Sequence, residues 1–146
     1  TMKCQAYVNA YLILIKEGKV LLSLRENTGY QDGLWSVVSG HVEEGESTLQ
    51  GCIREAKEEI GVDVAVEDLT FVHALHRLTD RINLDLFFEC HKWEGEPYNA
   101  EPHKCGGVKF YSLDELPNNM VDYVRKVLQG HELYSEKGWE MSAIPA

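Results

Sequence analysis

The segment from Gly40 to Val62 contains start and stop signals for one helix. Ser47 is a residue type that caps helix N-termini, and Gln50 follows three residues later, where its side chain can close a capping box. Gly61 suits the left-handed residue that ends many helices. Together these signals predict a helix over residues 48–60. At about 100° per residue, one stripe of this helix is apolar and should pack on a sheet: Leu49, Cys52, Ile53, Ala56 and Ile60.

Three glutamates lie together on the flank beside that stripe. Glu55, Glu58 and Glu59 are within four residues of one another, and side chains at such spacings on a helix are neighbours, so their like charges repel. A bound hard cation would offset this repulsion, since Mg²⁺ takes oxygen ligands and is often shared between carboxylates and substrate phosphates. The alternative is a solvated acidic helix face. The three carboxylates are therefore candidate ligands of a divalent cation.

The fixed positions around these glutamates form a longer pattern. From Gly40 the chain reads G-x5-E-x7-R-E-A-x-E-E-x-G-V. This resembles the Nudix box, G-x5-E-x7-R-E-U-x-E-E-x-G-U, in which U is a bulky aliphatic residue. Ala56 at the first U position is the one soft departure. The resemblance implies a magnesium-dependent hydrolase of nucleoside diphosphates linked to another group, with Mn²⁺ as a substitute ion.

The resemblance also assigns roles within the box, residues 40–62. It implies that Glu55, Glu58 and Glu59 hold the metal and that Arg54 orients them, a task suited to a bidentate guanidinium. Glu46 and Gly61 are expected to have structural roles, because Glu46 complements the helix dipole and Gly61 ends the helix.

The residues before the helix complete the expected metal site. Gly40 lets the backbone turn closely ahead of the helix, and the resemblance implies that the carbonyl of Ser39 is an additional metal ligand. Many relatives have Pro-Gly-Gly where this chain has Val38-Ser39-Gly40, so a side chain stands where glycine would permit positive φ.

Residues outside the box narrow the resemblance to the MutT-like branch. The run from Trp93 to Pro97, followed by Glu101, looks like that branch's loop carrying an acidic residue over the active site, and Glu101 is a further candidate ligand or base. Its alternative is a solvated loop carboxylate.

Four residues are candidates for substrate binding, again from their places in similar proteins. Arg25, Asp80 and Arg81 lie where relatives contact phosphate or the nucleoside, and arginines suit phosphate. Asn119 lies where an amide reads the base. Its alternative is to cap the helix that follows.

Elsewhere the chain alternates strands with helices. Apolar runs at 6–15 and 19–25 form one predicted hairpin, and runs at 69–78 and 81–91 form a second, whose later strand is expected to be half-buried with Ile82, Leu84, Leu86, Phe88 and Cys90 on one face. A strand near 108–111 and a helix ended by Gly130 follow. The first run is apolar on both faces, as in a central strand. We expect one α/β domain over 1–146, an α/β/α sandwich with a mixed β-sheet between helices, as the resemblance also implies.

Composition limits the partners. The net charge of −10 argues against duplex nucleic acid, which requires a basic face. The sequence has no long apolar run and no secretory signal, so we expect no membrane association and a cytoplasmic location. A monomer and a homodimer both stay open.

The leading functional hypothesis is a Nudix hydrolase that cleaves a nucleoside triphosphate, including oxidised forms, to the monophosphate and pyrophosphate. The enzymatic alternative is an ADP-ribose or NADH pyrophosphatase, because the box does not specify the leaving group. A nucleotide-binding regulator without turnover is the alternative from another class, weakened by three clustered carboxylates that a binding module has no need for.

Overall fold

The computed structural model describes residues 1–140. Its helical elements are α1 (Thr48–Ile60), the short 3₁₀ helix η1 (Val66–Asp68) and α2 (Asp122–Gln129). Its strands are β1 (Tyr7–Lys16), β2 (Lys19–Arg25), β3 (Trp35–Ser36), β4 (Val38–His41), β5 (Thr70–Leu78), β6 (Ile82–Cys90), β7 (Cys105–Ser112) and β8 (Tyr134–Lys137). No helix within these residues has the length and apolar composition needed to cross a bilayer.

The strands form one mixed sheet in the order β3-β2-β1-β6-β5-β8, with β4 also paired to β1 and β7 to β2. Both predicted hairpins are confirmed, since β1 pairs antiparallel with β2 and β5 antiparallel with β6. The pairings β1–β6 and β5–β8 are parallel. Strand β1 therefore lies in the middle of the sheet, between β2 and β6.

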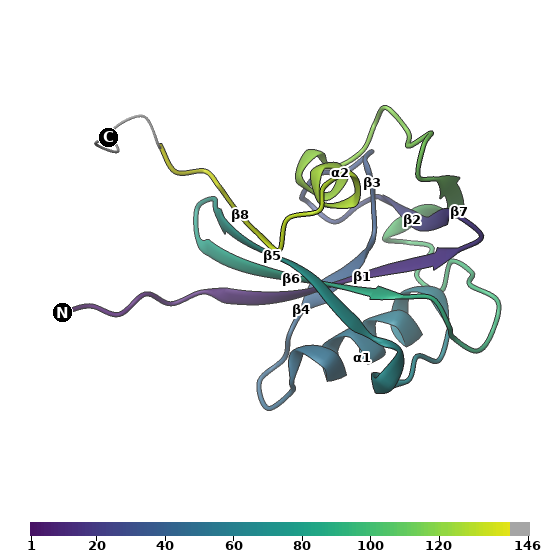
Figure 1. Ribbon diagram of the computed structural model, residues 1–146, viewed down its shortest axis with the longest axis horizontal. Coiled ribbons are helices and arrows are strands. Elements are labelled where there is room, and N and C mark those ends of the chain that lie inside the picture. Colours follow the sequence, from purple (N-terminus) through teal and green to yellow (C-terminus); the bar gives the residue numbers. More distant parts are fainter. Residues whose placement is uncertain (141–146) are drawn as a thin grey trace.

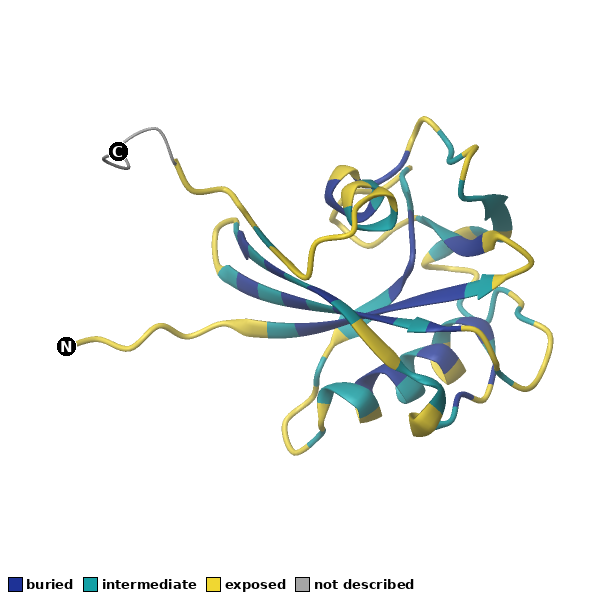
Figure 2. Cartoon of the chain, in the orientation of Figure 1, coloured by how far each residue is buried: buried dark blue, intermediate teal, exposed yellow. Residues whose placement is uncertain are grey.

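The two long helices cover opposite faces of this sheet (Figure 1). Alternate residues of β1 enter two different cores: Tyr11 and Ile13 pack with the α2 side, whereas Leu12 and Leu14 pack with the α1 side. The dark blue of β1 in Figure 2 shows that it is buried along most of its length. The predicted α/β/α sandwich with a mixed sheet and a central first strand is confirmed.

Helix α1 has the predicted bounds because its end signals act locally. The Ser47 hydroxyl accepts a hydrogen bond from the Gln50 N–H, and the Gln50 side chain accepts one from the Ser47 N–H, which closes the capping box. Gly61 has φ 69°, in the left-handed region. Ala56 and Ile60 on the apolar stripe are fully buried, so the stripe packs on the sheet as expected.

Strand β6 differs from its prediction. The sequence predicts a half-buried strand with one covered face. Phe88 and Cys90 on that face are buried, as predicted, but Leu84 and Leu86 are only partly buried. Asn83, Asp85 and Phe87 on the opposite face are almost completely buried. The expectation of a half-buried strand is wrong because both faces of β6 are covered, and two polar residues lie on the more deeply buried one.

The segment after α2 adds a strand that the sequence did not indicate. Strand β8 pairs in parallel with β5 at the edge of the sheet. His73 fixes it, since its ring nitrogens lie 2.7 Å from the Glu132 carbonyl oxygen and 2.7 Å from the Ser135 hydroxyl. The ring of Trp139 packs on His76. This segment covers the β5 edge.

Candidate active site

Arg54 organises the carboxylates of α1. Its Nε donates to Glu46 at 2.8 Å, and one terminal nitrogen donates to Glu55 at 2.6 Å and to Glu58 at 3.2 Å. Its other terminal nitrogen donates to the carbonyl of His41 at 2.9 Å. One guanidinium thus holds three glutamates and joins them to the end of β4, which offsets part of their mutual repulsion.

Glu46 takes part in this network as a loop-fixing residue. Besides Arg54, it accepts a hydrogen bond from the backbone N–H of Glu43 at 2.9 Å. The hydrogen bonds from Arg54 and from that N–H hold the pKa of Glu46 down to about 2. A permanently ionised, doubly held carboxylate suits the structural role expected for Glu46 and anchors Arg54.

Glu59 is the buried member of the cluster. Its Oε2 is buried and is the one buried side-chain oxygen or nitrogen within residues 1–140 that has no hydrogen-bond partner. Burial raises the pKa of Glu59 well above its usual value, and the adjacent carboxylates of Glu55 and Glu101 raise it further. An unpartnered buried carboxyl oxygen is costly, and a divalent cation would satisfy it. The donor set therefore fits a hard metal ion.

The described side chains do not form a ready-made ligand set. Within residues 1–140, no group of three or more His, Cys, Asp or Glu side chains is arranged to hold a metal ion. Arg54 occupies one oxygen of Glu55 and one of Glu58, which leaves the second oxygen of each carboxylate for an ion.

Strand β4 lies directly against the carboxylate of Glu55. A Cβ atom placed on Gly40 would lie 2.2 Å from Oε1 of Glu55, so this approach requires glycine. Ser39 does not have positive φ and pairs with Tyr11 of β1. The replacement of glycine by serine at position 39 is therefore compatible with the strand.

These residues line a cavity of about 490 Å³. The cavity brings together the three box glutamates, Arg54, the Ser39–Gly40 backbone, Glu101, Arg25 and Lys104. Every residue that the sequence proposed as a metal ligand therefore borders one cavity. Arg25 and Lys104 add positive charge to the same cavity.

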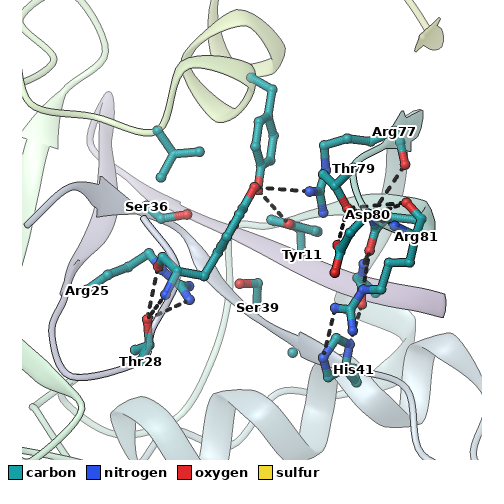
Figure 3. Close-up of a pocket in the computed structure, with 16 residues that line it drawn as sticks. Tyr11, Arg25, Thr28, Ser36, Ser39, His41, Arg77, Thr79, Asp80 and Arg81 are labelled. Atoms are coloured by element: carbon teal, nitrogen blue, oxygen red, sulfur yellow. Dashed lines mark hydrogen bonds between the residues drawn. The ribbon is translucent and has the colours of Figure 1, made fainter. Parts of the chain in front are cut away.

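A second cavity, of about 410 Å³, adjoins the first, and the two share Arg25, Thr28, Ser39, Gly40 and His41. Asp80 and Arg81 border it, as the substrate-binding prediction requires. Figure 3 shows Arg25 and Thr28 on one side, and His41, Arg77 and the 79–81 turn on the other. Arg81 also packs on Tyr7, with its guanidinium carbon 3.9 Å from the ring centroid.

Asn119 is not brought to either cavity. Its side chain donates to the Gly33 carbonyl at 3.2 Å, and its own carbonyl accepts from the N–H of Trp35 at 2.8 Å. The N-cap residue of helix α2 is Val121, and the helix has no side-chain cap, so Asn119 does not cap it either. The residue fixes the loop before β3.

Sequence reasoning missed several residues of the second cavity. Tyr11, Arg77 and Tyr123 border it, and Asp85 lies behind Arg77 at 2.7 Å. The available signal was the charged residue inside each of two adjacent strands, β5 and β6, because a strand-internal charge requires a partner.

Comparison with known proteins indicates the family of this chain. The family model described as NUDIX domain matches residues 5–130. Nudix hydrolase 5 of Arabidopsis thaliana is 38% identical over 129 residues, which are 84% of this chain and 40% of that protein. The CTP pyrophosphohydrolase of Escherichia coli K12 is 38% identical over 61 residues, 42% of this chain and 45% of that protein. The chain thus spans less than half the length of these two relatives.

Solved structures agree on the fold. A MutT NUDIX hydrolase from Burkholderia pseudomallei superimposes with a TM-score of 0.79 at 23% identity, covering 86% of this chain and 97% of that one. Since the NUDIX family model matches most of the chain, including the box, and the fold is that of a solved MutT structure, the chain belongs to the Nudix family.

Proposed function

We propose that this protein is a metal-dependent pyrophosphohydrolase that cleaves a nucleoside triphosphate to the monophosphate and pyrophosphate. The observation that carries the proposal is the cavity in which Arg54 holds Glu55 and Glu58 beside the buried, unpartnered oxygen of Glu59. A site built only for stability would leave no carboxyl oxygen buried without a partner.

The proposed ligands are Glu55, Glu58, Glu59 and the Ser39 carbonyl, with Glu101 as a further ligand or as the base. When bound, Mg²⁺, or Mn²⁺ in its place, would neutralise charge on the phosphoryl oxygens and activate a water molecule. Arg54 holds the carboxylates in place through its ion pairs with Glu46, Glu55 and Glu58.

Positively charged side chains of the same cavity are proposed to bind the substrate. Arg25 and Lys104 border the same cavity as the glutamates and are proposed to hold phosphate oxygens. Water adds to phosphorus, the bond to the bridging oxygen breaks, and pyrophosphate leaves, while one of the carboxylates accepts the proton of the water.

The choice of a triphosphate has independent support. One relative is named a CTP pyrophosphohydrolase, and the second cavity, on the far side of Ser39 and Gly40, is large enough for a small ligand group. The net charge of −10 favours small nucleotides over duplex nucleic acid as substrates.

The test is a product analysis. The protein is incubated with Mg²⁺ and a panel of ordinary and oxidised nucleoside triphosphates, ADP-ribose and NADH, and products are separated by chromatography. We expect monophosphate and pyrophosphate from at least one triphosphate. Turnover should fall by at least 100-fold in Glu59→Gln and stay unchanged in Glu67→Gln, which alters an exposed glutamate of η1 outside both cavities.

Two results would reject the proposal. One is the absence of hydrolysis with every compound of the panel, and the other is equal turnover by Glu59→Gln and Glu67→Gln. Cleavage of ADP-ribose or NADH alone would replace the triphosphate assignment with the alternative pyrophosphatase while retaining the metal site.

A further inference from the structure

A buried ion pair lies behind the second cavity. Nε of Arg77 donates to Oδ2 of Asp85 at 2.7 Å, and a terminal nitrogen donates to Oδ1 at 3.1 Å. Asn9 donates to the same carboxylate at 2.8 Å. Asp85 is 0% exposed and Arg77 is 5% exposed. The parallel register of β1 and β6, which places Asn9 opposite Asp85, builds this arrangement.

Such a pair is not explained by stability. Removing two charges from water costs free energy that their attraction often fails to recover, and apolar residues of similar volume are frequently as good or better. What the pair does provide is a fixed guanidinium. Because Asp85 holds two nitrogens of Arg77, the remaining terminal nitrogen can point in only one direction.

That nitrogen donates to the hydroxyl of Tyr30 at 3.1 Å. Tyr30 belongs to the loop between β2 and β3 and borders the second cavity. Its hydroxyl also lies 3.3 Å from that of Tyr123, which lies 3.3 Å from that of Tyr11. The hydroxyl of this loop residue is thus attached to β5 through Arg77 and to α2 through Tyr123, while the residue is 40% exposed.

The same loop also connects the second cavity to the first cavity, which holds the proposed metal ligands. The carbonyl of Tyr30 accepts a hydrogen bond from Nε of Arg25 at 2.8 Å, and Arg25 borders both cavities. A continuous series of contacts therefore runs from Asp85 through Arg77 and Tyr30 to Arg25.

We propose that Asp85 and Arg77 are positioning residues that fix Tyr30 as an aromatic side of the second cavity, and that this cavity binds the base of the nucleotide. The inference rests on the proposed function and adds its specificity element. The charge of Arg77 is neutralised by Asp85, and Tyr30, which is 40% exposed and borders the cavity, presents aromatic surface there. Such surfaces stack on nucleobases and hydrogen-bond to them.

The test measures binding without turnover. Calorimetry in the absence of metal compares AMP, GMP, CMP and UMP with ribose 5-phosphate, which carries the same sugar phosphate without a base. We expect at least one monophosphate to bind at least tenfold more tightly than ribose 5-phosphate, a difference of about 1.4 kcal/mol.

Tyr30→Phe removes only the hydroxyl that Arg77 holds, from a ring that is partly exposed, so the fold should persist. We expect it to weaken monophosphate binding about tenfold and to leave ribose 5-phosphate binding unchanged. The matched control is Tyr134→Phe, which removes a hydroxyl on β8 that contacts Glu136 outside both cavities.

Asp85→Asn should weaken monophosphate binding at least as much, because it acts through Arg77. Magnesium pyrophosphate has no base and needs only the first cavity, which holds the proposed metal ligands. A positioning role therefore predicts that its binding is unaffected in Tyr30→Phe and in folded Asp85→Asn. If Asp85→Asn does not fold, Tyr30→Phe alone decides.

The inference is overturned if ribose 5-phosphate binds as tightly as every monophosphate, or if Tyr30→Phe and wild type bind monophosphates equally. These outcomes are separate from failure of the proposed function, since an active hydrolase without a base contribution refutes only the inference. Base-dependent binding without hydrolysis of any compound refutes only the proposed function.

Discussion

Gly40→Ala is a test of the active-site geometry that should spare the fold. Gly40 pairs with Ala10 of β1, and its φ is outside the left-handed region that L residues avoid. The backbone therefore accepts alanine. The added methyl group, however, would lie 2.2 Å from Oε1 and 2.3 Å from Cδ of Glu55. The carboxylate must move.

The size of the movement follows from these distances. Ordinary contact begins at 3.4 Å, so the Glu55 carboxylate must shift by about 1.2 Å, and its 2.6 Å hydrogen bond to Arg54 is broken or redirected. A misplacement of about 1 Å can lower an enzymatic rate by about 100-fold, which corresponds to about 2.7 kcal/mol of activation free energy. The unfolding free energy should change by less than about 1 kcal/mol, because alanine restricts the unfolded chain.

The assay measures kcat from pyrophosphate release at saturating Mg²⁺, with melting temperature as the control for folding. Gly107→Ala is the matched variant, since Gly107 lies on β7 without positive φ and its new methyl group would meet Trp35 at 3.7 Å, an ordinary contact. We expect Gly107→Ala to keep wild-type kcat. A Gly40→Ala enzyme within threefold of wild type would show that turnover does not need the Glu55 carboxylate at this place.

Chelation of metal by EDTA should abolish hydrolysis, with recovery on adding Mg²⁺ or Mn²⁺; persistent activity would exclude a metal role. Glu58→Gln should lower kcat by at least 100-fold, as measured by phosphate release. Asp85→Asn should lower the unfolding free energy in urea by about 3–5 kcal/mol, because Arg77 loses its buried counter-charge. Asn119→Ala should leave relative kcat/KM among the four nucleoside triphosphates unchanged, whereas an altered ranking would restore the base-reading role.

The parts of the molecule specified by neighbouring residues were predictable. Ser47 and Gln50 close their capping box within one turn, and Gly61 ends the same helix, so the bounds of α1 follow from the sequence. The box spacing likewise identified residues that border one cavity, because its carboxylates share one helix and Arg54 lies beside them.

The second cavity was not predictable because it depends on strand register. Alternation in β6 indicated that the face carrying Leu84 is the covered one, whereas Asp85 is fully buried. Asp85 is satisfied by Asn9 and Arg77, and these come from β1 and β5. Which strands flank β6 is a property of the whole sheet, and so is the pairing that recruits the short polar strand β8.

The parallel pairing of β1 with β6 has a consequence for how the native state is reached. Asn9 and Asp85 meet across 76 positions of sequence, and closing so long a loop is entropically unfavourable and slow compared with forming a local helix. A nucleotide bound in the second cavity would bind only chains in which β1 and β6 are already paired. Adding the nucleotide during refolding should therefore increase the fraction of native chains.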